Sequence, residues 1–301
     1  MKSLLLVAST ASLASALCSH GTTLFPRDSP SPVSTFGYDG LSGPLGWYGL
    51  NPTRNAACAL GRHQSPINIV TDNYPPYSPS LNFTFDDYEN GAEIENLGTT
   101  LEVFVNGSMT IERPCRAPKS KPPTWNDGGA CNKQYKLKQF HFHSPSEHHI
   151  NGQVYPMEVH FVFQADDASL SVVGFPIEVG YNCNRTNTGP YRDFLTQIFL
   201  NVDDVAAPGS VGKTGPFNFY ETGLKRILEE STIYRYSGSL TTPPCSEGVT
   251  WSVVATPMTI DANTYTKVKK IMGFNSRYTQ NQPGEINLLD ASREQLDEES
   301  D

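Results

Sequence analysis

The sequence predicts a protein of the α+β class that is mainly β, with a single domain around a large, mostly antiparallel twisted central sheet and short peripheral helices. Short runs rich in Val, Ile, Phe and Tyr alternate with turn residues over most of the 301 residues, whereas helical periodicity is confined to two segments. Many strands with few crossover helices favour antiparallel pairing over repeated β-α-β units. A hydrophobic content of 38% with 18% charged residues is that of a globular chain that can bury a large core.

Each element follows from a local pattern. Six runs of strand composition between turn residues are expected to form strands: 67–70, 81–85, 101–105, 136–143, 157–163 and 172–179. An amphipathic helix is expected at 191–199, where apolar residues recur at helical spacing. A second helix is expected at 261–272, because Asp261 can cap its first turn and Gly273 can end it. Neither helix carries obvious chemistry, so their apolar faces are expected to pack in the core.

Both ends of the chain differ in composition from the middle. Residues 1–16 combine Lys2, an apolar run and small residues, a pattern typical of a secretory signal peptide. Residues 17–34, rich in Ser and Pro, are predicted to form a flexible arm, 35–290 the folded domain, and 291–301 a disordered acidic tail. The signal pattern predicts a secreted, extracellular protein. The acidic end has no hydrophobic stretch, which argues against a lipid anchor.

Composition also bears on partners and modification. A formal net charge of -9 argues against nucleic acid and anionic membranes as partners, since both attract basic surfaces. Three Asn-x-Ser/Thr sequons, which agree with passage through a glycosylating pathway, are found at Asn82, Asn106 and Asn184. Six cysteines in a secreted chain indicate an oxidised framework of disulfides.

Two of the predicted strands carry histidines in alternation with other residues. Alternate side chains of a strand share a face, so Gln139, His141 and His143 point one way. Glu158 and His160 share a face of the following run in the same manner. If the two strands are neighbours, three imidazoles meet. Three nitrogen ligands without a fourth protein ligand are typical of a catalytic zinc, which keeps a position open for water.

Histidines in a strand can also be ordinary core residues, and a His-x-His pair alone is a weak signal. Here each strand also offers a polar neighbour on the same face, Gln139 in the first and Glu158 in the second. Such groups can hold an imidazole in the tautomer that a metal needs. Their presence favours a metal site over core packing.

The residues around these histidines resemble one family. The stretch Ser-Glu-His-His-Ile at 146–150, Tyr155, and Glu-Val-His-Phe-Val at 158–162 are similar to the signature of the alpha-class carbonic anhydrases of the secreted, eukaryotic type. Gln-Phe-His-Phe-His at 139–143 resembles the first zinc strand of that family. The similarity spans about 250 residues. It includes two further motifs, Gly-Arg-His-Gln-Ser-Pro-Ile-Asn-Ile at 61–69 and Gly-Ser-Leu-Thr-Thr-Pro-Pro at 238–244.

The resemblance implies a function, in which zinc on His141, His143 and His160 would interconvert carbon dioxide and bicarbonate through a zinc-bound hydroxide. By the same resemblance Thr241 accepts the hydrogen bond of the hydroxide and donates one to Glu147, whose carboxylate can only accept. Sulfonamides and small anions are expected to inhibit by taking the open position on zinc. Carbon dioxide would lie in a largely apolar pocket, which the resemblance assigns to Val162, Val172, Leu240, Thr242, Val249 and Trp251.

The resemblance also bears on the cysteines. Family members outside the cytosol commonly join the positions that Cys58 and Cys245 occupy here, and we expect that disulfide. The other four cysteines allow three pairings. Because Cys115 and Cys131 bracket a stretch rich in Pro and Lys, a local bond between them is the first choice, which leaves Cys18 for Cys183.

One position departs from many fast members of the family. In those proteins a histidine follows an Asn-x-Gly motif at the mouth of the cavity and shuttles protons, whereas here Asn96-Leu97-Gly98 is followed by Thr99. A hydroxyl has no pKa near neutrality and cannot accept and release protons as an imidazole does. We therefore expect an empty shuttle position at Thr99 and a turnover limited by proton release.

Two other functions fit much of the same pattern. A carbonic-anhydrase-like binding or matrix module without significant turnover would be expected to lose zinc ligands, and all three histidines are present here. A zinc esterase would use the same residues on activated esters, so esterase activity stays open as a side reaction. Rates on both substrates, measured before and after metal removal, discriminate among these functions.

Overall fold

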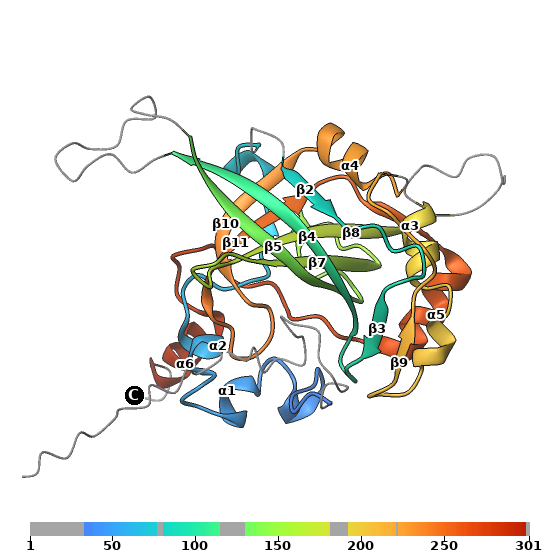
Figure 1. Ribbon diagram of the computed structural model, residues 1–301. Coiled ribbons are helices and arrows are strands. Elements are labelled where there is room, and N and C mark those ends of the chain that lie inside the picture. The colour runs from blue at the N-terminus through green and yellow to red at the C-terminus, as the bar shows by residue number, and fades with distance from the viewer. Residues whose placement is uncertain (1–32, 77–80, 115–129, 181–191, 221, 299–301) are drawn as a thin grey trace, which may run out of the picture.

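The computed structural model describes residues 33–76, 81–114, 130–180, 192–220 and 222–298. Within these ranges a ten-stranded sheet crosses the molecule (Figure 1), with its strands in the order β10-β11-β8-β7-β5-β4-β3-β9, while β12 lies beside β8 and β2 beside β4. The strands of this sheet are β2 (Asn82–Phe85), β3 (Glu93–Asn96), β4 (Leu101–Pro114), β5 (Ala130–His143), β7 (Met157–Gln164), β8 (Leu170–Gly180), β9 (Val211–Lys213), β10 (Ile233–Ser239), β11 (Glu247–Val254) and β12 (Met258–Asp261). A separate parallel pair joins β1 (Asn68–Ile69) to β6 (His149–Ile150).

Most neighbouring strands of the large sheet are antiparallel, as predicted, and the exceptions involve β8. Strand β8 pairs in parallel with β11 over its first half and with β12 over its second half. The six predicted runs all contain strands, but β4 and β5 extend well beyond the predicted 101–105 and 136–143. The fold class is confirmed, because a large mixed central sheet with few short helices makes up most of the described part of the chain.

The helices are short and lie around the sheet. In Figure 1, α1, α2 and α6 gather near the C-terminal end, whereas α3 and α5 lie on the opposite side of the molecule. Their bounds, together with those of the 3-10 helices, are α1 (Trp47–Leu50), α2 (Ala56–Leu60), α3 (Arg192–Ile198), α4 (Leu224–Glu230), α5 (Ala262–Met272), α6 (Leu288–Glu298), η1 (Gly40–Ser42), η2 (Thr71–Asn73) and η3 (Val202–Val205).

Helices α3 and α5 confirm the two predicted helices. Oδ1 of Asp261 accepts hydrogen bonds from the backbone N–H groups of Asn263 and Thr264, both at 3.1 Å, which is the expected N-terminal cap of α5. The N–H of Gly273 bonds to the Lys269 carbonyl at 2.8 Å and ends that helix. Buried side chains of α3 pack against aromatic residues of β5 and β7 in the core.

The predicted disordered tail from residue 291 is wrong up to residue 298, because α6 (Leu288–Glu298) occupies this stretch. The side chain of Asn287 accepts a hydrogen bond from the Leu289 N–H at 2.9 Å, and thus caps the first turn. Helix α6 also packs against α2. The high charge of this stretch suggested disorder, but a capping Asn and a series of strong helix formers favour the helix.

The main hydrophobic core covers one face of the sheet, while the other face carries a row of polar groups and a second, smaller apolar cluster. Phe140 and Phe142 of β5 are fully buried in this core, so the alternate residues of β5 point to the opposite face. A β-bulge between Leu137 and Gln139 shifts the register. Leu137 therefore also lies in the core, while Gln139 begins the polar row that continues along β5.

Several predictions concern segments outside the described residues. These are the signal peptide 1–16, most of the arm 17–34, the sequon Asn184, and Cys18, Cys115 and Cys183. Asn106 lies exposed within β4, and the sequon at Asn82 begins β2. Glycosylation of Asn82 and of Asn106 stays a prediction. In the described part of the chain, no helix is both long and apolar enough to cross a membrane.

Candidate metal centre

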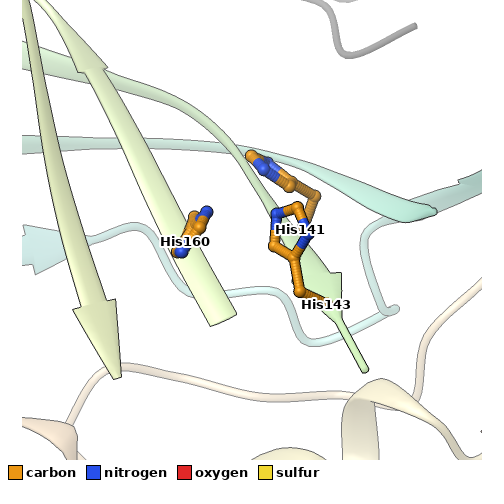
Figure 2. A group of neighbouring side chains, drawn as sticks. All are labelled: His141, His143 and His160. Carbon is orange, nitrogen blue, oxygen red and sulfur yellow. The ribbon is translucent and has the colours of Figure 1, made fainter. Parts of the chain in front are cut away.

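Three histidines from two neighbouring strands meet on the polar face of the sheet. His141 of β5 lies directly opposite His160 of β7 in the antiparallel ladder, and His143 is two residues further along β5. Their ring centroids are 4.5–5.3 Å apart, and Figure 2 shows the three rings grouped between the two strands. One ligand nitrogen from each lies within 4.8 Å of the other two. The exposed fractions are 7%, 1% and 1% for His141, His143 and His160.

Each ring has one nitrogen held by an acceptor, which determines the nitrogen that it can offer to a metal. Nδ1 of His141 lies 2.9 Å from Oε1 of Gln139, and Nδ1 of His143 lies 2.8 Å from the backbone oxygen of Asn275. In His160 the held nitrogen is Nε2, at 2.7 Å from Oε1 of Glu158. A metal would therefore be bound by Nε2 of His141, Nε2 of His143 and Nδ1 of His160. The neighbouring acceptors would fix the tautomer of each ring.

The chemistry of these groups fits a zinc ion. Within the described residues, Nε2 of His143 is buried and has no hydrogen-bond partner, although a buried polar atom normally has one. Burial lowers the pKa of His143, which favours the neutral imidazole that metals bind. Three neutral nitrogen donors without a carboxylate ligand suit a catalytic zinc, because they leave the metal its full charge.

Glu158 is a buried carboxylate, and each of its two oxygens accepts two hydrogen bonds. Oε1 accepts from His160 and from Nδ1 of His148, and Oε2 accepts from the backbone N–H groups of Glu147 and His148, at 2.7–2.9 Å. Burial alone would raise the pKa of Glu158, but the neighbouring His148 and His160 hold it well below its ordinary value. The carboxylate therefore stays ionised and fixes the ring of His160.

This network continues beyond Glu158 into the protein. Nε2 of His148 lies 2.7 Å from the hydroxyl of Tyr236, which donates to the Ser65 hydroxyl at 2.7 Å. These groups are buried, and they connect β7 to β10 and to the segment before β1. The ring of His148 thus joins Glu158 on one side to Tyr236 on the other. The sequence indicated no role for Tyr236, because this residue lies in β10, which is not among the predicted strands.

Glu147 and Thr241 are both buried, and the described residues show no hydrogen bond between their side chains. Oε1 of Glu147 accepts the backbone N–H of Arg277 at 2.9 Å and lies 3.5 Å from Nδ1 of His143. Its Oε2 lies 3.9 Å from Nδ1 of His160 and has no hydrogen-bond partner among the residues that the structure describes. The carboxylate therefore lies beside the rings of His143 and His160, and the orienting role of Thr241 stays a prediction.

An apolar wall lies beside the metal-binding face. Trp251 packs with its ring centroid 4.8 Å from that of His160. Thr242 is buried, and its pocket role stays a prediction. The predicted pocket residues that share one buried apolar cluster with Trp251 are Val162, Val172 and Val249, and Leu240 packs against them.

The predicted shuttle position is covered by the start of the described chain. The hydroxyl of Thr99 is hydrogen-bonded to that of Ser34 at 2.9 Å, and Thr99 is 8% exposed. Its carbonyl accepts from Nδ2 of Asn275 at 2.8 Å. Two other residues near the triad were missed by sequence reasoning. Asn275 approaches from a distant loop, and buried Glu102 lies opposite His141 on β4.

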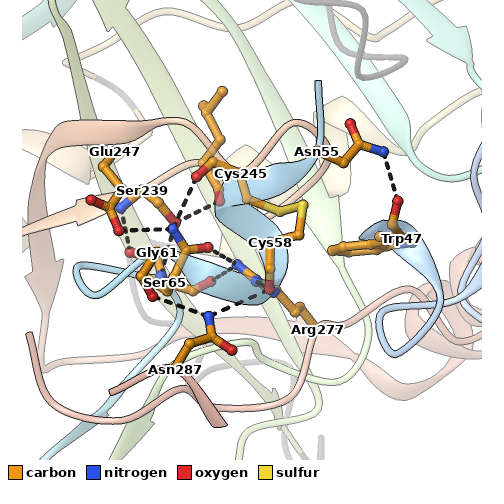
Figure 3. Close-up of a disulfide and its surroundings, with 12 residues drawn as sticks. Trp47, Asn55, Cys58, Gly61, Ser65, Ser239, Cys245, Glu247, Arg277 and Asn287 are labelled. Atoms are coloured by element: carbon orange, nitrogen blue, oxygen red, sulfur yellow. Dashed lines mark hydrogen bonds between the residues drawn. A yellow bond between two sulfur atoms is a disulfide. The ribbon is translucent and has the colours of Figure 1, made fainter. Parts of the chain in front are cut away.

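The predicted disulfide between Cys58 and Cys245 is present, and it joins residues 187 positions apart. Both cysteines are fully buried, and Figure 3 shows Arg277 donating to the Cys58 carbonyl, at 3.2 Å. The N–H of Cys245 donates to the Thr242 carbonyl at 2.8 Å. The disulfide therefore ties the loop that carries Thr241 to helix α2.

Replacing both Cys58 and Cys245 by alanine is expected to lower the free energy of unfolding by roughly 2–5 kcal/mol, because the unfolded chain regains the entropy of a long closed loop. Guanidinium unfolding of both proteins measures this difference. The single variant Cys58→Ala breaks the same bond and should show a similar loss. An unchanged unfolding midpoint in the double variant would contradict the stabilising role of the disulfide.

The fold and the triad define a class of protein, a mainly β enzyme fold that offers an open three-nitrogen metal site on the face of its central sheet. The chain belongs to the eukaryotic-type carbonic anhydrase family, whose model matches residues 42–297. It is 31% identical over 241 residues to a carbonic anhydrase of Pectobacterium atrosepticum, which covers 79% of this chain and 83% of that protein.

Solved structures agree with this assignment. A fungal alpha carbonic anhydrase from Aspergillus oryzae superimposes with a TM-score of 0.72 at 39% identity, over 87% of this chain and 99% of that one. An alpha carbonic anhydrase from Thermovibrio ammonificans, solved with the inhibitor sulfanilamide, gives a TM-score of 0.62 at 32% identity, over 82% and 95%. The family resemblance read from the sequence is thereby confirmed.

Proposed function

We propose that this protein catalyses the reversible hydration of carbon dioxide to bicarbonate and a proton at a zinc held by His141, His143 and His160. The observation that carries the proposal is the arrangement of the three rings: each has one nitrogen held by an acceptor, and one ligand nitrogen from each lies within 4.8 Å of the other two. Family membership supports the same reaction. The buried Nε2 of His143 supports a metal rather than a hydrogen-bonded core cluster.

When bound, zinc supplies a nucleophile near neutral pH by lowering the pKa of a water to about 7. The protein side chains supply the remaining functions. Gln139, Glu158 and the Asn275 carbonyl hold the imidazoles in place. Thr241 orients the attacking oxygen through its hydroxyl, which requires a hydrogen-bond acceptor nearby. Glu147, whose Oε2 lies on the triad side and has no hydrogen-bond partner among the described residues, is the group that we assign to this task.

The substrate binds beside this centre without a charged partner. Carbon dioxide is uncharged and weakly polar, so an apolar surface suits it better than a hydrogen-bonding one. The buried cluster of Val162, Val172, Val249 and Trp251, with Leu240 against it, offers such a surface next to His160. We assign the carbon dioxide pocket to this cluster together with Thr242.

Stopped-flow measurement of carbon dioxide hydration with and without an aromatic sulfonamide tests the proposal. We expect rapid hydration that the sulfonamide suppresses at about one equivalent per chain when the protein concentration exceeds the dissociation constant. Ester hydrolysis, measured on the same samples, should fall in parallel if it uses the same centre. Hydration that is absent, or that persists with the sulfonamide bound, would contradict the proposed function.

Proton release is expected to limit the turnover, because Thr99 cannot act as a shuttle and is held by Ser34 and Asn275. Adding imidazole buffer should therefore raise the hydration rate several-fold at saturating carbon dioxide, while leaving the rate at low carbon dioxide nearly unchanged. The measurement is the maximal rate as a function of buffer concentration at constant pH and ionic strength.

Thr99→His should reduce this buffer dependence if the ring reaches solvent past Ser34. Thr99→Val, which removes the hydroxyl without adding a titratable group, is the matched control and should keep the dependence. A wild-type rate that is high and indifferent to buffer concentration would mean that another group carries the proton.

We also propose that the protein acts outside the cell. The predicted signal at 1–16 supports this location, and so does the disulfide between Cys58 and Cys245, since disulfides persist in oxidising compartments. Cleavage at the predicted site and recovery of the protein from the medium of expressing cells test this proposal. Retention of the full-length chain inside the cells would contradict it.

A further inference from the structure

Helices α1, α2 and α6 surround a hollow on the surface of the molecule, and they lie close together in Figure 1. The volume of this hollow is about 600 Å³. It is separate from the metal centre, because neither the three metal-binding histidines nor the residues of the proposed carbon dioxide pocket line it. The hollow is therefore a second candidate binding surface.

The walls of the hollow carry large apolar side chains that water reaches. Leu41 is 87% exposed and Leu45 is 71% exposed. Five of the eleven exposed large apolar residues in the described part of the chain line this one hollow, and we call them the leucine patch: Leu41, Leu45, Tyr48, Leu50 and Leu60. Single exposed apolar residues are normal, whereas a contiguous group of them marks an interaction surface.

The leucine patch has the area of one half of a dimer interface. Its exposed fractions, from 40% to 87%, together equal about three fully exposed large residues, which is roughly 500 Å² of surface. A standard interface buries about 800 Å² on each partner, and about 65% of a homodimer interface is apolar, which again gives roughly 500 Å². A second copy of this chain would therefore cover the patch without leaving a large apolar surplus.

The shape of the patch suits contact with an identical patch, which a two-fold symmetric dimer requires. Small residues line the hollow, namely Gly46, Gly49 and Ala59, and a Cβ built at Gly49 meets no atom within 4 Å. Leu41 and Leu45 are the two most exposed residues of the patch. One surface thus offers both a hollow and the side chains that can fill it.

The charges around the hollow allow two copies to meet. Asp290 and Arg293 of α6 are the only charged residues that line it in the described part of the chain, and their side chains are paired at 2.6 Å. The hollow is thus neutral, although the whole chain carries a formal net charge of -9. Two copies would therefore not repel each other at this contact, and a core with few charged residues is typical of protein interfaces.

We propose that the leucine patch is a dimerisation surface, on which two copies of this chain are related by a two-fold axis and each places Leu41 and Leu45 in the hollow of the other. The buried side of α2 carries Cys58, whose disulfide with Cys245 ties the Thr241 loop to this helix. The dimer contact therefore covers the outer side of a helix that supports the metal centre.

Sedimentation equilibrium of the purified protein at concentrations of about 0.1–100 µM measures the association. We expect an equilibrium between monomer and dimer with a dissociation constant on the order of 1 µM or lower, because the interface has the standard size. The unfolding temperature should also rise with protein concentration, since only the folded chain dimerises.

Two variants change the patch in different ways. Gly49→Leu fills the hollow without adding a charge, and it should weaken the dimer at least about 10-fold because the leucines of the second copy are excluded. Leu41→Arg should weaken it roughly 100-fold, since each dimer loses two buried leucines and gains two charges. Leu200→Arg is the matched control. Leu200 is 57% exposed and follows α3, which lies on the opposite side of the molecule in Figure 1, so this variant should dimerise as the wild type does.

Three outcomes would overturn the proposal. A wild-type protein that stays monomeric up to the highest concentration would leave the patch to another occupant. A dimer that neither Gly49→Leu nor Leu41→Arg weakens, although circular dichroism shows both variants folded, would have its interface elsewhere. Assembly beyond the dimer would show a contact that does not close on a two-fold axis.

Discussion

Replacing His143 by alanine is expected to remove both zinc and carbon dioxide hydration. Only three histidines converge on the site in the described part of the chain, so a variant with two ligands has no spare group. Loss of a group that merely orients a ligand costs about 10- to 100-fold in metal affinity or activity. Loss of a ligand itself should cost more than that. Zinc content per chain and stopped-flow hydration measure the two effects separately.

His63→Ala is the matched control, because His63 is exposed and only its backbone N–H bonds to Glu247. It should retain zinc and the full rate. Circular dichroism and thermal unfolding of both variants show whether the fold is intact. A folded His143→Ala protein with one zinc per chain and the wild-type rate would show that the metal, if any, is bound elsewhere.

Replacing Thr241 by alanine is expected to leave zinc in place and to reduce the hydration rate by roughly 100-fold, the size of effect found when one orienting hydrogen bond is removed from an active site. The three ligands are untouched by this change. What is lost is the hydroxyl that would hold the attacking oxygen in line with carbon dioxide. Zinc analysis and steady-state hydration on the same sample separate binding from orientation.

Thr241→Ser tests whether the hydroxyl, rather than the volume of the side chain, is responsible. Serine keeps the donor and acceptor, and the rate should return to within several-fold of the wild type. If Thr241→Ala hydrates carbon dioxide at the wild-type rate, Thr241 has no orienting role. Oε2 of Glu147, which has no hydrogen-bond partner in the described part of the chain, must then serve some other group.

The part of the site that could be predicted from the sequence rests on the period of two in β-strands. That period placed Gln139, His141 and His143 on one face of their strand, and Glu158 with His160 on one face of the next. In the structure the two strands are neighbours, and these residues lie on the same face of the sheet. The pairing of His141 with Gln139 and of His160 with Glu158 followed from the same rule. These are local features, which short sequence patterns record well.

The features of the site that the sequence did not predict depend on contacts between distant segments. The acceptor for His143 is a backbone carbonyl, that of Asn275, and any residue type could provide it. A bulge places Leu137 in the core, while Gln139 lies on the face of the metal site. This bulge depends on the register between β5 and β7, and composition does not reveal that register. The position of Tyr236 behind His148 likewise depends on how β10 packs beside β11.

Among the elements, the short ones were the least predictable. Strands β9 and β12 have three and four residues, too few for a clear alternation pattern. The sequence predicts a disordered tail from residue 291, within α6, because charge dominates the composition there, although Asn287 is a recognisable cap. Tertiary packing against α2 gives this helix a partner that local propensity does not indicate.

Carbon dioxide hydration measured on one preparation before metal removal, after removal with a chelator, and after addition of one equivalent of zinc tests the central claim most directly. The account predicts hydration that disappears with the metal and returns with zinc in proportion to the zinc bound, up to one ion per chain. Hydration that persists in a protein shown to be free of metal, or that stays absent after zinc has bound, would contradict the assignment of His141, His143 and His160 as the catalytic metal site.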